Sequence, residues 1–120
     1  MKITNLTRGT LIAGRVQIAD TFLSRLMGLL NRSLAEGEGL IIPRCQSIHM
    51  LFMRFPIDVI FADKENKVVG LLRGLKPFRF SPIFWKASFA IELPVQTIEK
   101  SKTELGDVLQ NEGQTLLSRK

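Results

Sequence analysis

The sequence predicts a mostly β domain of the α+β class, folded as a compact antiparallel β-sandwich or barrel with one short helix near residues 20–30. Two observations carry this prediction: many short apolar segments alternate with polar turns, and a single early segment has helical spacing. Of the 120 residues, 45% are apolar and 23% charged, which is typical of one globular domain. We expect this domain to span residues 1–110, with a C-terminal tail at 111–120.

The first elements are one strand and the helix. Apolar and polar residues alternate over residues 10–18, which predicts a half-buried strand. Asp20 can cap a helix over residues 21–30. Four apolar residues recur there at helical spacing: Phe22, Leu26, Leu29 and Leu30. Residues 33–39, which two glycines interrupt, then form a loop.

Strands dominate the rest of the chain. They are expected at residues 39–43, 45–52, 57–62, 67–73 and 87–93. Residues 63–66 form a polar turn between two of them, in which Asn66 can adopt a positive φ. A short helical turn is expected near residues 97–102, and Gly106-Asp107 makes a tight turn after it.

The composition restricts the class of protein. A single cysteine excludes an internal disulfide framework, and no run reaches the ~18 apolar residues of a membrane-spanning helix. The first residues contain no uninterrupted apolar stretch typical of a signal peptide, so we expect a soluble cytoplasmic protein. The net charge of +6 attracts nucleic acids, anionic lipids and acidic partners without selecting among them.

Reactive side chains concentrate in residues 44–61, which hold the chain's only cysteine, Cys45, and its only histidine, His49. On a straight strand these two residues lie about 13 Å apart. A nucleophile and its base must come within about 3 Å, so a catalytic pair would need a helix or a sharp bend. Because the chain has no second histidine or cysteine, we predict no metal site and no cofactor.

Ser47 and His49 would lie on the same face of that strand, about 7 Å apart along the backbone. Their side chains could therefore converge on one ligand. Alternatively, His49 is hydrogen-bonded within the protein and orients a neighbouring loop. Both interpretations fit the sequence.

Asp58 follows a proline turn and precedes a strongly apolar run, so its carboxylate is expected to be partly buried and to need a donor. Arg54, Arg25 or His49 could supply that donor. Asp58 either caps the proline turn through backbone N–H groups or orients His49 or a ligand hydroxyl. Glu92 permits the same two interpretations.

Residues 73–86 interleave four cations with four aromatic side chains and contain two prolines, which argues against an interior strand. The aromatic residues could fold back as a lid on the core while the cations face water. Phe80, Phe84 and Trp85 could instead form the rim of a pocket, or the segment could bind a membrane or a protein. Nucleic-acid binding is disfavoured because no recognised motif accompanies the charge.

Several segments together resemble one family, DUF192, also called UPF0127, over roughly residues 5–110. The segments are Arg25-Leu26-Met27-Gly28-Leu29-Leu30, Cys45-Gln46-Ser47-Ile48-His49, Phe52-Met53-Arg54-Phe55-Pro56-Ile57-Asp58, Glu92-Leu93-Pro94 and Gly106-Asp107. Met50 stands where the family is expected to have threonine, which removes a hydroxyl near the site. Gln96 stands where a glycine often follows the Glu-Leu-Pro segment.

The resemblance implies a compact, jelly-roll-like β-sandwich with a short helix, and it implies no activity. The residues that it carries over as a possible site are Ser47, His49, Asp58 and Glu92, with Arg25 as a candidate partner.

Three functional hypotheses follow. The first is a ligand-binding domain with a polar pocket near Ser47, His49 and Asp58, for a small anionic or polyhydroxylated ligand. The second is a hydrolase in which His49 is the base and Asp58 orients it. The third is a protein- or membrane-association module that uses residues 73–86.

Overall fold

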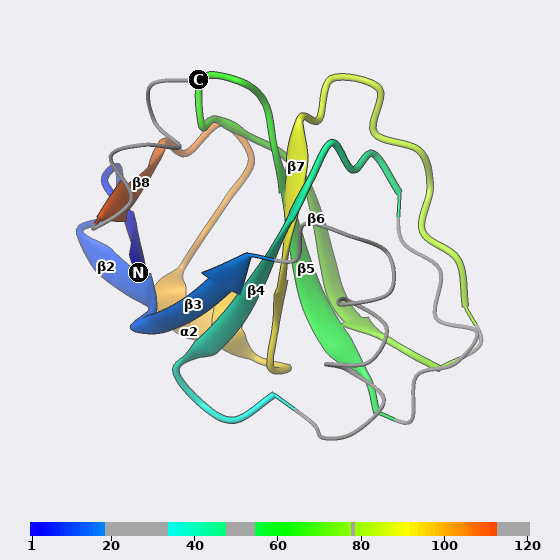
Figure 1. Ribbon diagram of the computed structural model, residues 1–120, viewed down its shortest axis with the longest axis horizontal. Helices are drawn as coiled ribbons and strands as arrows, with labels where there is room; N and C mark the ends of the chain where they lie inside the picture. The colour runs from blue at the N-terminus through cyan, green and yellow to red at the C-terminus, as the bar shows by residue number, and fades with distance from the viewer. Residues whose placement is uncertain (19–33, 48–54, 78, 113–120) are drawn as a thin grey trace.

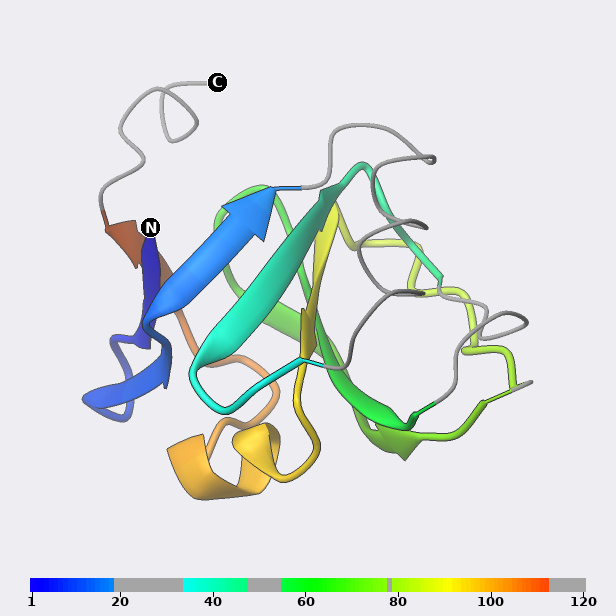
Figure 2. The same cartoon turned by 60° about the horizontal axis from the view of Figure 1, so that its bottom comes forward.

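A computed structural model describes residues 1–18, 34–47, 55–77 and 79–112. These described residues form two β-sheets and one short helix (Figures 1 and 2). The three-stranded sheet has the order β2-β1-β8, with β1 (Lys2–Asn5), β2 (Thr10–Ala13) and β8 (Leu109–Glu112). The five-stranded sheet has the order β3-β4-β7-β5-β6, with β3 (Arg15–Ile18), β4 (Glu38–Pro43), β7 (Phe89–Leu93), β5 (Ile57–Ala62) and β6 (Val68–Leu75).

The mostly β fold is thus confirmed, and the two sheets pack on each other without closing into a barrel within the described residues. One core cluster draws its residues from both sheets and from the helix: Ile3, Ile12, Ala13, Val16, Ile41, Ile60, Val68, Ile91, Leu93, Ile98 and Leu109. A second cluster lies on the opposite face of the five-stranded sheet: Ile42, Cys45, Ile57, Val59, Phe61, Ala87 and Ala90. The five-stranded sheet is therefore the middle layer of the molecule.

β5 is central to this arrangement because it is buried on both faces. All of its residues are buried, which explains the continuous apolar run predicted as a strand at residues 57–62. Ile57, Val59 and Phe61 face the second cluster, and Ile60 faces the first. The turn that follows is also confirmed, since Asn66 adopts a φ of 64°.

The prediction of one strand over residues 10–18 is wrong. The N–H groups of Gly14 and Arg15 both donate to the carbonyl of Gly37, at 2.9 Å each, and the chain passes from one sheet to the other there. β3 then runs parallel to β4. The five-stranded sheet is therefore mixed, with one parallel pair among the antiparallel pairs that the sequence predicted.

Two other boundaries differ from the prediction. Arg44 has a φ of 51°, which ends β4, and residues 45–47 form no strand although one was expected from residue 45 onward. The remainder of that expected strand and the helix near residues 20–30 lie outside the described residues. At the other end, β8 reaches Glu112 and pairs with β1, so the expected tail overlaps this strand by two residues.

The helical turn expected near residues 97–102 is present as α2 (Thr97–Ser101). It packs beneath the sheets, with Ile98 buried in the first core cluster (Figure 2). Among the described residues, no helix is long and apolar enough to cross a membrane.

Gln96 precedes α2 with φ 75° and ψ 0°, in the left-handed region that favours glycine. The resemblance implies a glycine at this position, and a glycine adopts this left-handed conformation without strain. We expect Gln96→Gly to raise the free energy of unfolding by about 1 kcal/mol, since the strain of a side chain at positive φ is removed. Urea unfolding would measure it. Gln110→Gly in the extended β8 is the control and should be destabilising instead.

Candidate functional site

The Asp58 side chain accepts hydrogen bonds from two backbone N–H groups at one end of the five-stranded sheet. Its carboxylate is 1% exposed. Oδ1 accepts the N–H of Gly74 and Oδ2 accepts the N–H of Ile98, both at 2.9 Å. The side chain therefore caps backbone N–H groups, as one interpretation expected, but these belong to β6 and to the first turn of α2 rather than to the proline turn.

Ser47 follows Arg44, which lies at the other end of the same sheet. The N–H of Arg44 donates to Ser88, whose own N–H donates to Ala62, so these residues form one row across the sheet. Asp58 stands four residues before Ala62 on β5, about 13 Å away along the strand. Ser47 itself is exposed. The described residues therefore do not bring Ser47 and Asp58 together.

Three further candidates, His49, Arg25 and Arg54, lie outside the described residues. The fourth, Glu92, is 3% exposed and pairs directly with Val59, on the face of the second core cluster. Asp58 pairs with Leu93 and so points to the first cluster. The two buried carboxylates therefore face opposite sides of the sheet, and no metal-binding group of three His, Cys, Asp or Glu occurs among the described residues.

Phe84 anchors the long segment between β6 and β7 to the core. Its ring lies 4.5 Å from the ring of Phe61, centroid to centroid, and packs directly on the backbone of Gly70. Two hydrogen bonds of 2.8 Å fix its neighbourhood: the N–H of Phe84 donates to the carbonyl of Gln46, and the Gln46 amide donates to the carbonyl of Trp85. Phe84 is therefore a lid on the core, as one interpretation of residues 73–86 expected.

Three other large apolar side chains of the described part of that segment face solvent. Phe80 is 67% exposed, Ile83 50% and Trp85 75%. The cations Lys76, Arg79 and Lys86 are exposed as well. We call these six residues the basic–aromatic loop. The sequence identified the aromatic residues of this loop but not Ile83. The packing of Phe84 on the core is what shows that its neighbours Ile83 and Trp85 face solvent.

A polar network links the segment that follows α2 to the three-stranded sheet, and sequence reasoning did not find it. The Asp107 carboxylate accepts hydrogen bonds from Arg8, from the Asn5 amide at 3.0 Å and from the N–H of Glu104 at 2.9 Å. Burial by itself would raise the pKa of Asp107, but these hydrogen bonds outweigh it and hold the pKa below its ordinary value. In the sequence, the only indication of this network was the Gly106-Asp107 pair, which is one of the segments that resemble the family.

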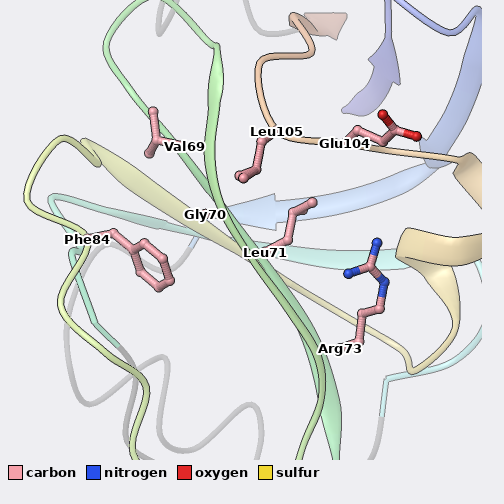
Figure 3. A pocket seen from close by; sticks show the side chains of 7 residues that line it. All are labelled: Val69, Gly70, Leu71, Arg73, Phe84, Glu104 and Leu105. Atoms are coloured by element: carbon pink, nitrogen blue, oxygen red, sulfur yellow. The ribbon is translucent and has the colours of Figure 1, made fainter.

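A groove of about 490 Å³ runs along β6 (Figure 3). Its lining is mostly apolar and includes one cation and one anion: Val69, Gly70, Leu71, Arg73, Phe84, Glu104 and Leu105. Among the described residues predicted to line or rim a pocket, Phe84 belongs to this set, and Ser47, Asp58 and Glu92 do not.

Comparison with known proteins identifies the family. The model of the DUF192 family (Uncharacterized ACR) matches residues 3–111. A UPF0127 protein from Thermococcus sibiricus is 41% identical over 110 residues, which cover 88% of this chain and 71% of that protein. A UPF0127 protein from Pyrococcus furiosus is 37% identical, with 88% and 94% covered.

A solved structure has the same fold. It is the crystal structure of a protein of unknown function from Novosphingobium aromaticivorans, 20% identical, with a TM-score of 0.75 over 92% of this chain and 82% of that one. The likeness in structure supports the fold, and the family match covers nearly the whole described chain. This chain belongs to the DUF192 family.

Proposed function

We propose that this protein associates with anionic membrane surfaces through the basic–aromatic loop. The observation that carries the proposal is the exposure of Phe80, Ile83 and Trp85 on one segment that also presents three cations. Scattered apolar side chains are ordinary on protein surfaces, but large ones gathered on one anchored loop indicate a binding surface.

The chemistry of the loop suits a lipid interface. Tryptophan and phenylalanine are favoured where an apolar side chain enters the acyl boundary beside polar headgroups. Full burial of one such side chain contributes about 1.5–3 kcal/mol. Each lysine or arginine close to an anionic leaflet adds about 1 kcal/mol. The net charge of +6 attracts the whole chain toward the same surface.

The loop is also fixed well enough to present these side chains. Phe84 holds the loop to the sheet. The hydrogen bonds of Gln46 to the backbone of Phe84 and Trp85 fix the position of Trp85, the most exposed of these side chains. Little conformational entropy would therefore be lost at Trp85 when it inserts.

The other two hypotheses draw less support. A polar pocket or a hydrolase site would need Asp58 near Ser47 or His49, but both oxygens of Asp58 accept backbone N–H groups at the end of the sheet away from Ser47. Because His49 lies outside the described residues, both hypotheses stay predictions.

Vesicle flotation tests the proposal. The protein should float with vesicles that contain phosphatidylglycerol and not with pure phosphatidylcholine vesicles. Trp85 is the only tryptophan and the chain has no tyrosine, so a blue shift of its emission would report insertion of the loop itself. The double variant Phe80→Ala/Trp85→Ala should bind at least about tenfold more weakly, from the lost apolar transfer free energy.

Leu11→Ala is the matched control, since Leu11 is also a large exposed apolar residue, at 56%, but lies on β2, away from the loop. It should float like the wild type. Equal flotation of the wild type and the double variant would contradict the proposal. So would failure of the wild type to float with anionic vesicles, which would leave a protein partner as the occupant of the loop.

A further inference from the structure

β6 is an edge strand of the five-stranded sheet, with β5 on one side. At its beginning, the N–H of Val68 donates to the carbonyl of Asp107 and its own carbonyl accepts from Gly106, so both groups of Val68 point away from β5. Bonded and non-bonded pairs alternate along an antiparallel ladder. Leu71 pairs with Ile60, which stands two residues before the β5 partner of Val68, so the backbone groups of Leu71 point outward too.

Arg73 lies two residues beyond Leu71 on the same strand, so its N–H and C=O point outward as well. No described strand or loop hydrogen-bonds to the outward N–H and C=O groups of these two residues. The groove of about 490 Å³ opens along this stretch, so a ligand can reach these backbone groups (Figure 3). An unpaired strand edge of this kind is a template for an added strand.

These backbone groups decide which class of ligand the groove fits. A lipid acyl chain would cover the apolar walls of the groove but would leave the N–H and C=O groups without hydrogen-bond partners, which is costly. An extended peptide covers the same walls and also hydrogen-bonds to the strand, which is how peptides add to exposed sheet edges. The groove therefore favours a peptide over a lipid.

The accessible part of the edge is short. At the start of β6, Val68 is already hydrogen-bonded to residues 106–107. At the other end, Gly74 turns the chain with a φ of 64° and donates its N–H to Asp58. The stretch that a peptide can pair with is therefore centred on residues 71–73.

The side chains beside this stretch favour an acidic peptide. Arg73 is exposed, and none of the ion pairs among the described residues includes it. Glu104 lies on the same side of the groove, but Arg8 pairs with it at 2.9 Å (Figure 3). Leu71 and Leu105 form the apolar surface beside them, and Leu105 is 65% exposed. The net charge of +6 attracts acidic partners to the same site.

We propose that this groove binds an extended acidic peptide of a partner protein, which adds to the edge of β6 as an antiparallel strand, the more stable of the two pairings. One peptide residue then lies opposite Arg73 and another, two positions later, lies opposite Leu71. Their side chains share a face of the sheet with Arg73 and Leu71. The first should therefore be acidic and the second apolar, beside Leu105. The residue between them points to the opposite face, on the side of Phe84 (Figure 3).

A short peptide should bind this site weakly. The pairing spans few residues, and the ion pair with Arg73 is exposed to solvent. We therefore expect a Kd on the order of 100 μM.

Fluorescence anisotropy of the full chain with the fluorescein-labelled peptide Thr-Glu-Phe-Val-Thr tests the proposal. Its Glu is placed to face Arg73 and its Val to face Leu71. Replacing the Glu of the peptide by Lys should weaken binding about tenfold or more. The variant Arg73→Glu should reverse this preference and bind the Lys peptide more tightly than the Glu peptide.

Methylation of single peptide amides tests the strand pairing itself. The N–H groups of the peptide's Glu and Val should donate to the carbonyls of Arg73 and Leu71, so N-methylation of either should abolish binding. The N–H of the Phe between them points away from β6, and its N-methylation should leave binding nearly unchanged.

Thermal unfolding controls for folding of the variant, and because Arg73 is exposed its replacement should change stability little. No binding of the Glu peptide at about 1 mM would overturn the proposal. Equal binding of the Glu and Lys peptides, or tolerance of methylation at Glu and Val, would overturn it as well. Binding of decanoate without binding of the peptide would show that the groove takes a lipid instead. The peptide assay involves neither Phe80 nor Trp85, so the membrane proposal is tested independently.

Discussion

Replacing Asp58 with alanine should lower the free energy of unfolding by about 2–4 kcal/mol. Two backbone N–H groups, of Gly74 and Ile98, would lose their acceptor in a place where water does not readily replace it. The loss is large compared with the total stability of a domain of this size, about 5–15 kcal/mol. The variant should therefore unfold at a clearly lower urea concentration.

Asp63→Ala is the matched control. Asp63 also accepts two backbone N–H groups, from Glu65 and Lys67 at 2.9 Å each, but at an exposed turn. Water can satisfy those donors after the substitution, so the expected change is below about 1 kcal/mol. An Asp58→Ala variant as stable as the wild type would contradict the capping role and revive a functional interpretation of this carboxylate.

The sequence located Asp58 as an important residue but could not assign its role. Burial followed from the apolar run after it, and the need for a donor followed from burial. The donors themselves lie 16 and 40 residues further along the chain, and local patterns carry no information on such contacts. The same limit explains why Ser47 and Asp58 looked like neighbours, since only the register of the sheet separates them.

Strand positions were predictable where burial gives a local pattern. β5 has the expected bounds, and β4, β6 and β7 lie within one or two residues of them. Pairing was not predictable: the passage from β2 to β3 between sheets depends on the carbonyl of Gly37, which is remote in sequence. Similarly, the adjacent aromatic residues Phe84 and Trp85 suggest that one of the two side chains faces the core. It is Phe84, because its ring fills the space above Gly70.

Gly70→Ala should be the most informative change in that region, with an expected loss of about 1–3 kcal/mol. A Cβ at Gly70 would come within 2.5 Å of two atoms of the Phe84 ring, which is closer than real contacts allow. Either the ring or the strand must shift, and the contact between the rings of Phe84 and Phe61 would be strained or lost. Urea unfolding measures the loss. Gly14→Ala is the control, since its nearest neighbour lies 3.9 Å away and little change is expected.

A double-mutant cycle with Phe84→Ala separates this steric cause from a general cost of alanine in β6. Phe84→Ala should itself be destabilising, but adding Gly70→Ala to it should then cost close to nothing, a coupling of about 1–3 kcal/mol. Additive losses of stability would contradict the role of Phe84 as a lid on the core.

Because the backbone of Trp85 is hydrogen-bonded to Gln46 beside Phe84, Gly70→Ala should also change the emission of this single tryptophan in the folded protein. Displacing the lid should then weaken vesicle binding even with Phe80 and Trp85 intact, since an anchored loop loses less entropy on insertion than a loose one.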